Sequence, residues 1–511
     1  MNYKWKIMIV ALLGLFPDMM NSTISSIALP KILAEFNENV DKLQMVTSTY
    51  LLGMAVSSAL VAYLMGKFGI KKIWAVAQVF YLCASVCCGL AWNANALIVF
   101  RTIMGLCGGV LVPIAMTMVF TTFKSEEQGG AMGLMGMPMV MAPAIGLSLG
   151  GYLVEYVNWR WCFYISVPFV LVSLAATAFW LKDTEKQPSL PMDIKGFLFV
   201  SAGFGSILYA LSNASTWGWD DNRTIILLAV GLVCIGLWVL VALREKVPML
   251  DVRVFAIKEY SLGTFLTLII TVGMYGAMLL LPLYLQNIRG LGAFESGMMM
   301  LPFSLSAVIG SLVGGRLYDK YGGSVPVILG LLMSGISTWK LSVLDTGTST
   351  SFIIFDLLIF GIGLGMSMMP VMTYTLAGVP HKLTAEASSI NTVLRSVFGS
   401  MGTAVFATLL SDAEKFNINV LVQTVTPDSG TTLQILSTIQ VYMQQLGMSV
   451  QSAYQTAVYY LYQMTVLQAT ILAFEKVFVI GAVIMLVGIV PALFVRKIVN
   501  GNNNKKNVHM M

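Results

Sequence analysis

The sequence predicts an all-α integral membrane protein with about fourteen transmembrane helices. The chain has 511 residues, of which 57% are hydrophobic and only 11% are charged, and its mean hydropathy is +0.81. Soluble domains carry about 25% charged residues, so this composition excludes an ordinary soluble protein. Apolar runs long enough to cross about 30 Å of hydrocarbon recur from one end of the chain to the other, which indicates a polytopic protein.

The apolar runs give the expected helices in chain order. Two polar linkers, residues 182–195 and 244–259, divide the runs into groups of six, two and six. This predicts a six-helix bundle in residues 1–181, linkers with an inserted two-helix hairpin in 182–259, and a second six-helix bundle in 260–511. The expected spans lie near residues 7–29, 45–65, 73–92, 96–122, 129–154, 161–181, 196–213, 224–243, 261–285, 297–317, 324–343, 352–376, 384–410 and 477–495.

The distribution of basic residues gives an orientation. Cytoplasmic loops carry an excess of Lys and Arg, and about 20 of the 30 basic residues fall on the side that both termini share. We therefore expect both termini in the cytoplasm. The net charge of +6 reflects this topological bias, and no basic stripe with interleaved aromatic residues indicates nucleic-acid binding.

Residues 411–475 form one long segment outside the expected spans. Residues 454–474 carry no charge, but three glutamines dilute their hydropathy, and a fifteenth span here would place the basic C-terminal residues outside the cell. We expect an extracellular loop that contains an amphipathic helix or hairpin. The polar tail after the last span, residues 501–511, is expected to be short and cytoplasmic.

Several classes of site are excluded by the residues available. The first span resembles a signal peptide, yet Pro17-Asp18 interrupts it and no small-x-small cleavage site follows.

The chain has six cysteines without a CxxC pair and two histidines, which predicts no disulfide framework and no metal site. It also lacks a GxxxxGK[ST] loop, which predicts no ATP hydrolysis. We expect neither an enzyme nor a bound cofactor, so transport by this chain would use a gradient.

The two groups of six spans carry similar loops. Residues 58–72 and 311–325 match at four positions, each loop between the second and third spans of its group. Parallel repeats of this kind build transporters with a site between two bundles. The loops supply candidate residues for a cytoplasmic gate: Lys67, Gly69, Arg316, Asp319, Lys320 and Gly322.

The segment 138–168 is predicted to form the wall of a membrane pathway. Gly146 and Gly150 stand one helical turn apart, so a neighbouring helix can approach their backbone closely. Pro143 frees a carbonyl that needs a buried or water-lined setting. Tight packing alone is the alternative interpretation of this helix.

Few ionisable residues lie inside the expected spans, and we select Asp18, Arg101, Asp356 and Arg395 as candidates. A charge there costs about 2.5 to 3.5 kcal/mol, and such residues usually face a cavity or a partner. Asp18 is the candidate proton carrier, and a structural carboxylate paired with a neighbouring helix is the alternative. Arg101 could pair with Asp18, orient its helix, or extend to the headgroups.

The second-bundle candidates are Asp356 and Arg395. Asp356 lies only about 7 Å into its span, so it could lie at the membrane interface or contact the substrate, and both interpretations stay open. Arg395 lies deep in the penultimate span and is a better candidate anchor. A cavity lined by Asp18 and Asp356 would favour lipophilic cations, whereas a neutral or anionic cargo would depend on Arg101 or Arg395.

Several segments together resemble motifs of the 14-span drug:proton antiporters of the major facilitator superfamily. They are NSTISSIALP (21–30), RTIMGLCGG (101–109), the run 143–151 that includes Gly146, Gly150 and Gly151, the WRW at 159–161, PLYLQ (282–286), the loop 315–323, and EASS (386–389) with Arg395. The resemblance covers most of the chain. It implies a major-facilitator-type fold in a bacterial cytoplasmic membrane, and export of amphiphilic drugs or other toxic lipophilic compounds in exchange for protons. A monomer is the working expectation.

The chain departs from the family pattern at three positions. Asn21 stands where the family places an acid, and Asp18 lies one turn earlier on nearly the same helix face. Gly66 replaces the usual Asp of the first loop, and Leu147 replaces a Pro after Gly146. The candidate coupling residues are therefore Asp18, Asn21 and Arg101. A dedicated exporter or importer of one metabolite or lipid remains the alternative, and a non-transporting receptor or enzyme has no motif in its support.

Overall fold

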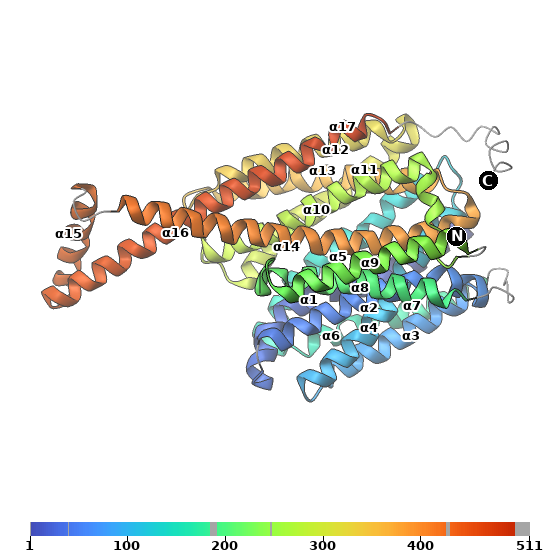
Figure 1. Cartoon of the computed structure of the whole chain (residues 1–511), viewed down its shortest axis with the longest axis horizontal. Helices are drawn as coiled ribbons and strands as arrows, with labels where there is room; N and C mark the ends of the chain where they lie inside the picture. The colour runs from blue at the N-terminus through green and yellow to red at the C-terminus, as the bar shows by residue number, and fades with distance from the viewer. Residues whose placement is uncertain (1, 39, 184–191, 246–247, 426–429, 496–511) are drawn as a thin grey trace.

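Helices make up all the regular secondary structure in the part of the chain that the computed structural model describes, residues 2–38, 40–183, 192–245, 248–425 and 430–495 (Figure 1). Fourteen of these helical segments are long and apolar enough to cross a membrane. The predicted all-α fold with fourteen membrane helices is therefore confirmed. We call the end of the molecule where α1 begins the proximal end and the opposite end the distal end.

The first bundle contains six membrane spans. Asn93 begins the fourth helix, because its side chain accepts a hydrogen bond from the Ala96 amide at 2.7 Å. The fifth helix ends in one wider turn, Leu153–Val157, and two short helices together make the sixth span. The helices are α1 (Tyr3–Phe36), α2 (Val40–Phe68), α3 (Ile70–Gly89), α4 (Ala94–Thr122), α5 (Gln128–Tyr152), α6 (Trp161–Tyr164) and α7 (Ser166–Trp180).

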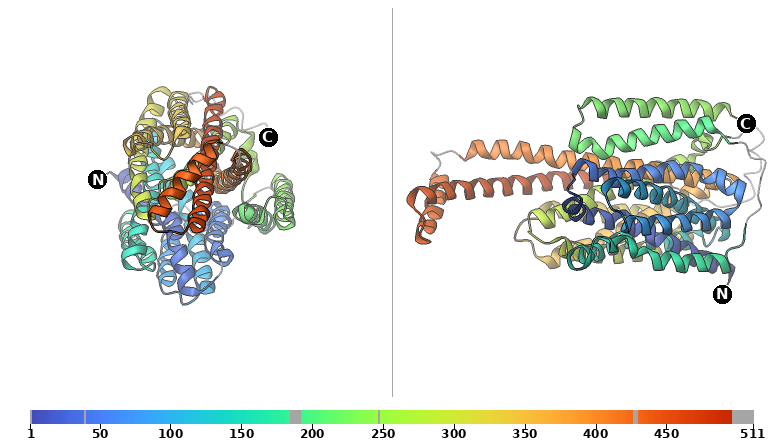
Figure 2. Two further views of the ribbon diagram at one scale, coloured as in Figure 1. Left: turned by 90° about the vertical axis from the view of Figure 1, so that its left-hand side faces the viewer. Right: turned by 90° about the horizontal axis from the view of Figure 1, so that it is seen from below.

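The inserted helices α8 (Ile194–Trp217) and α9 (Asn222–Arg244) lie on the flank of the molecule (Figure 2). The Asp193 and Asp221 carboxylates cap their N-termini. α8 packs against both α2 and α14, and Trp219 donates a hydrogen bond to Thr408 of α14 at 2.7 Å. Only 17% of the α9 span is buried, so α9 presents most of its surface to lipid.

The second bundle repeats the six-span plan. Its helices are α10 (Lys258–Asn287), α11 (Ala293–Tyr321), α12 (Ser324–Lys340), α13 (Thr350–Ala377), α14 (Thr384–Thr424) and α16 (Val450–Val487), with the short α15 (Gly430–Gln445) between the last two and α17 (Ile489–Ala492) at the proximal end. The bundles meet most extensively along α5 and α11, and also along α2 and α14. The α5–α11 contact is close because glycines line it. A Cβ atom on Gly133 would lie 2.6 Å from the Ser311 carbonyl oxygen.

The described part of residues 411–475 is helical, where the sequence suggested a loop with an amphipathic helix or hairpin. α14 and α16 contain 41 and 38 residues, so at 1.5 Å per residue they are about 62 and 57 Å long. These lengths are roughly twice the thickness of the hydrocarbon layer. Both helices continue past the distal end of the bundles, and α15 lies across their tips (Figure 1). We call the described residues of 411–475 the helical projection.

Candidate functional site

Four polar side chains from four helices meet inside the first bundle. Asp18 of α1, Tyr50 of α2, Tyr81 of α3 and Arg101 of α4 are each no more than 1% exposed. We call these four residues the acid cluster. Isolated polar groups are costly at this depth, so their mutual contacts decide what the cluster can do.

The Asp18 carboxylate is held on one side only. Tyr50 donates a hydrogen bond to its Oδ1 atom at 2.7 Å, and Tyr81 donates to the neighbouring Pro17 carbonyl at 3.1 Å. The Oδ2 atom is buried and has no hydrogen-bond partner within the described structure. Gly108 of α4 makes room for the carboxylate, because a Cβ atom there would lie 2.0 Å from Oδ1. The acid therefore has one free oxygen that can carry a proton.

Arg101 lies close to the acid but does not neutralise it directly. Its guanidinium stacks on the Tyr50 ring at 4.3 Å and lies 5.6 Å from the Phe163 ring. Its Nη2 atom donates to the Asn21 carbonyl at 3.4 Å, which links α4 to α1. The structure describes both Arg101 and Asp18, and no ion pair of 4.0 Å or less joins them. Arg101 is completely buried, so the headgroup interpretation of this residue is wrong.

The structure thus brings the three predicted coupling residues together. Asp18 and Asn21 lie one turn apart on α1, both with no exposed surface, and Arg101 faces them from α4. The alternative interpretation, a structural carboxylate paired with a neighbouring helix, also has support, because the Tyr50 hydroxyl that donates to Asp18 belongs to α2. A carboxylate with one donor, one free oxygen and a nearby guanidinium can exist with or without its proton.

The distal half of α5 packs against α1 of its own bundle and against α11 of the second bundle. Thr23 of α1 donates to the carbonyl of Pro143 itself at 2.9 Å, which links α1 to α5. Cβ atoms on Gly146 and Gly150 would lie 2.7 Å from the Met20 carbonyl and 2.5 Å from Ile24, both on α1. On the adjacent position, Gly151 faces α11, where a Cβ atom would lie 3.1 Å from the Cα of Phe294.

At the proximal end, Asp319 of α11 caps the N-terminus of α5. Its two carboxylate oxygens accept hydrogen bonds from the Gly129 and Gly130 amides, each at 2.8 Å. The unpaired amides and the positive end of a helix favour an anion there. This contact joins the two bundles, and an opening of the proximal end between α5 and α11 must break it.

The other predicted gate residues surround the ends of α2 and α11. Gly69 and Gly322 both adopt φ +86°, a left-handed conformation that favours glycine, so the two loops turn alike. Lys67 donates to the Tyr63 hydroxyl at 2.7 Å, and Lys320 lies 5.0 Å from the Tyr321 ring. Arg316 is exposed.

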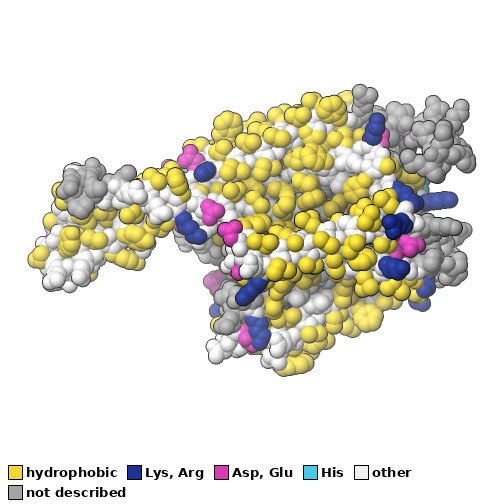
Figure 3. Space-filling model, in the orientation of Figure 1, with side chains coloured by type: hydrophobic (Ala, Val, Ile, Leu, Met, Phe, Trp, Pro, Cys, Tyr) yellow, Lys and Arg dark blue, Asp and Glu magenta, His cyan; other side chains and the backbone are white. Residues whose placement is uncertain are grey.

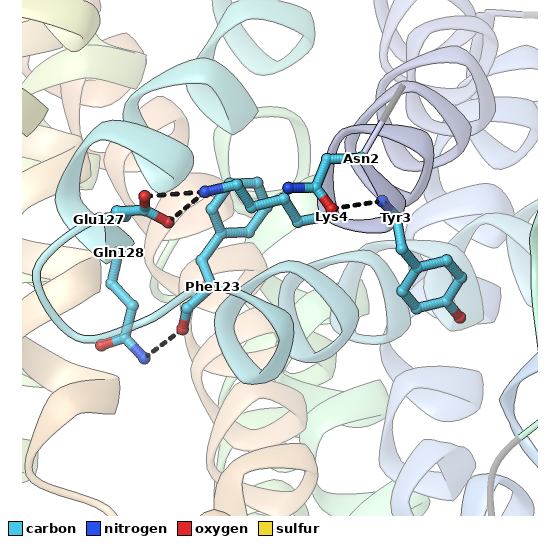
Figure 4. Close-up of polar contacts among 6 residues, drawn as sticks. All are labelled: Asn2, Tyr3, Lys4, Phe123, Glu127 and Gln128. Carbon is cyan, nitrogen blue, oxygen red and sulfur yellow. Dashed lines mark hydrogen bonds and ion pairs between the residues drawn. The ribbon is translucent and has the colours of Figure 1, made fainter.

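The loop between α4 and α5 is fixed to α1 on the same face. Lys4 forms an ion pair with Glu127 at 2.7 Å and lies 5.7 Å from the Phe123 ring (Figure 4). Gln128 donates to the Phe120 carbonyl at 3.0 Å. Glu127 immediately precedes α5, so this network positions the amides that Asp319 caps.

The second-bundle candidates lie apart from the acid cluster. Asp356 is 1% exposed, and Ser337 of α12 donates to its Oδ2 at 2.7 Å. It lines a pocket of about 180 Å³ whose other lining residues all belong to α12 and α13. Asp18 and Asp356 therefore do not share that pocket. Arg395 of α14 extends to the first bundle, where its Nη1 lies 3.4 Å from Met139 Sδ of α5.

The distal end of α1 is held by the turn that follows α5. Arg160 pairs with Glu35 at 2.7 Å, Trp159 donates to the same carboxylate, and the guanidinium stacks on the Trp159 ring at 4.4 Å. Burial raises the pKa of Glu35, but the two hydrogen bonds and the Arg160 charge outweigh it and hold this pKa below its ordinary value.

Sequence reasoning missed Tyr50, Tyr81 and Gly108. Tyrosines are common in apolar spans, and no pattern along α2 or α3 distinguishes these two from residues that face lipid. Gly108 lies within the RTIMGLCGG segment, but only the fold shows that it faces Asp18. Among the described residues no group of three or more His, Cys, Asp and Glu side chains could hold a metal ion.

Comparison with known proteins supplies the family. Residues 11–403 match the family model of the Major Facilitator Superfamily. The chain is 30% identical over 98% of its length to an uncharacterized MFS-type transporter, YhcA, of Bacillus subtilis, covering 94% of that protein. It is 29% identical to the lincomycin resistance protein LmrB of Listeria monocytogenes, over 79% of this chain and 85% of that protein.

A solved structure gives the same fold at lower sequence similarity. The crystal structure of the human organic anion transporter MFSD10 superposes with a TM-score of 0.58 at 13% identity, covering 95% of this chain and all of that one. The fourteen membrane helices, the bacterial relatives and the family match are consistent with a multi-pass protein of the cell membrane. The chain therefore belongs to the Major Facilitator Superfamily of membrane transporters.

Proposed function

We propose that this transporter exports amphiphilic drugs or other toxic lipophilic compounds in exchange for protons, by alternating access of a site between its two bundles. The observation that carries the proposal is the Asp18 carboxylate, which is fully buried, accepts one hydrogen bond from Tyr50 and keeps its second oxygen free. The names of several relatives, which denote lincomycin resistance, tetracenomycin C resistance and export, and multidrug transport, support export of toxic compounds.

The acid cluster supports proton coupling by its electrostatics. Ionised Asp18 is stabilised by the Tyr50 hydroxyl and by the nearby Arg101 charge, whereas protonated Asp18 removes a charge from a water-poor interior. Small movements of α4 against α1 change the position of Arg101 and so the proton affinity of the acid. This couples proton binding to the relative position of helices within the first bundle, with the proton gradient as the energy source.

The two gates of the proposed cycle lie at opposite ends of α5. The Asp319 cap closes the proximal end, and the approach of Gly151 to Phe294 closes the distal end between the same two helices. We assign the proximal end, with both termini, to the cytoplasm, because most of the basic residues fall on that side. The working unit in this proposal is the monomer.

The test is substrate-dependent proton movement in proteoliposomes that contain a trapped pH indicator. The panel contains a lipophilic cation, an uncharged lipophile and lincomycin. Asp18→Asn is expected to abolish proton movement, whereas the matched carboxylate-to-amide change Asp345→Asn, in an exposed distal loop, leaves it intact. Undiminished exchange in Asp18→Asn would overturn the coupling role. Transport of a single panel compound would favour a dedicated exporter instead of a multidrug one.

A further inference from the structure

The helical projection begins at a belt of charged residues. Glu414 of α14 and Glu475 of α16 lie in this belt, and beyond it the described residues 416–425 and 430–474 carry no charged side chain. Thr470 donates to Glu414 at 2.7 Å, and Asn417 donates to the Ala469 carbonyl at 3.1 Å. These contacts fasten α14 to α16 at the base of the projection. Figure 3 shows charged side chains at this level and a mostly yellow and white projection beyond it.

The projection forms a partly open pocket of about 380 Å³ between its three helices. The α16 side of the pocket is a single helical stripe, since its residues recur at spacings of three and four. Six of the twelve lining side chains are aliphatic, and tyrosine, serine, threonine and glutamine supply the polar groups. The lining residues are Val422, Val425, Thr432, Leu433, Leu436, Ser437, Gln440, Tyr454, Val458, Leu461, Tyr462 and Thr465.

The chemistry of the lining selects an uncharged lipophilic ligand. Sites for small molecules usually enclose about 300 to 1,000 Å³, are mostly apolar and contain a few polar groups, as this pocket does. None of the described lining residues is ionisable at neutral pH, so a charged ligand would lose water without gaining an ion-pair partner among them. Tyr454 and Tyr462 can donate hydrogen bonds to a hydroxyl, ester or amide oxygen on the ligand.

The pocket lies farther from the bundles than the charged belt does, and this position suggests a role for it. Thr465 is ten residues and Tyr454 is 21 residues before Glu475 on α16, so the pocket lies about 15 to 32 Å beyond the charged belt. A charged belt marks the level where the hydrocarbon ends. A lipophilic molecule released at that level returns to the bilayer, because burial of apolar surface is favourable there. An apolar pocket farther out can bind the released molecule before it returns to the bilayer.

We infer that the helical projection is an acceptor site for an uncharged lipophilic molecule, which leaves the bundles along α14 and α16 and is held away from the membrane surface. This inference rests on the proposed export function, and it adds a second binding site and the charge class of the cargo. The helix α14 supplies both Arg395 at the bundle interface and Val422 in the pocket, so one helix connects the two sites.

The test is photo-labelling of the full chain in lipid nanodiscs with an uncharged long-chain alcohol that carries a diazirine. Adducts are mapped by mass spectrometry. We expect them to concentrate at the pocket lining, and we expect a matched probe with a quaternary ammonium group to label these peptides at least about tenfold less. Leu436→Glu places a carboxylate in the pocket and should reduce labelling there by about tenfold or more.

Two further variants make the result specific. Leu436→Trp fills the pocket without adding charge and should also reduce labelling. Leu446→Glu adds the same charge at an exposed position outside the lining, where Leu446 is 63% exposed, and should leave labelling unchanged. Adducts spread evenly over the projection, equal labelling by the charged probe, or cross-links to a second copy of the chain at the pocket would overturn the inference.

The outcome is separable from the test of proton coupling. Pocket labelling without substrate-driven proton movement would retain the site and reject the proposed export by proton exchange. Proton-coupled transport without pocket labelling would retain the proposed function and reject the acceptor site.

Discussion

Gly108→Ala is the sharpest test of the acid cluster, because one added methyl group enters the space of the proposed proton carrier. The new Cβ would lie 2.0 Å from Oδ1 and 2.8 Å from Cγ of Asp18, well inside contact distance. The short Asp18 side chain must rotate, and it then loses the hydrogen bond from Tyr50. A hydrogen bond to a charged group contributes about 1.5 to 3 kcal/mol, so proton-coupled transport should fall about ten- to hundredfold.

Two matched glycine variants separate this effect from helix packing. A Cβ on Gly236 of α9 would have no neighbour within 4 Å, so Gly236→Ala should be neutral. Gly109→Ala places its methyl group 2.1 Å from the Met54 carbonyl of α2, so it disturbs the α2–α4 contact without touching the acid. Overpacking of this kind costs about 1 to 3 kcal/mol and should lower the thermal stability of the protein.

The assay is substrate-driven proton movement in proteoliposomes, with the melting temperature of each purified variant measured beside it. We expect Gly108→Ala and Gly109→Ala to lower the melting temperature by similar amounts, and only Gly108→Ala to lose coupling. If Gly108→Ala moves protons as fast as Gly236→Ala, Asp18 does not carry the coupled proton in the position described.

Three more predictions follow from other contacts. Arg101→Lys keeps the charge but loses the planar stack on its neighbours, so transport should fall by more than about tenfold, whereas Arg160→Lys at an exposed stack should transport normally in the same assay. Because the pKa of Glu35 is lowered in the folded state, its stabilising effect is present above its ordinary value of 4.5 and is lost as pH falls through the folded value. Glu35→Gln should remove this part of the pH dependence of the melting temperature, an effect of about 0.2 to 1 kcal/mol, and an unchanged pH profile would contradict it. Asp319→Ala should weaken the cap of α5 by about 0.5 to 2 kcal/mol, so amide exchange in residues 128–136 should be about two- to thirtyfold faster than in Asp345→Ala, and equal rates would remove Asp319 from the gate.

Much of the candidate site follows from sequence once a bilayer is assumed. Charged residues are expensive in hydrocarbon, so Asp18 and Arg101 stand out against their apolar neighbours, and the fold does bring them together with Asn21. Asp356 stands out in the same way, yet it faces Ser337 and a small pocket within the second bundle. A charge in a span indicates a partner, but the direction in which it points depends on the rotation of its helix.

The helical projection shows a second limit of prediction from sequence. Hydropathy gives the part of a helix that crosses the membrane, because the thickness of the bilayer sets the length of an apolar run. It does not show that α14 and α16 continue without a break far beyond the last charged residues. The outer part of α16 packs against α14 and α15, and such long-range contacts leave no strong local pattern.

The sequence alone determined the class of protein, the fourteen spans, the duplicated loops and the ionisable residues of the interior, because each follows from transfer free energies and local motifs. Only the tertiary structure decided which groups meet. It placed Tyr50 and Gly108 around Asp18, Asp319 on the N-terminus of α5, and a pocket between three helices beyond the charged belt. These contacts depend on helix rotation and register, which are set by the packing of many residues far apart in the chain.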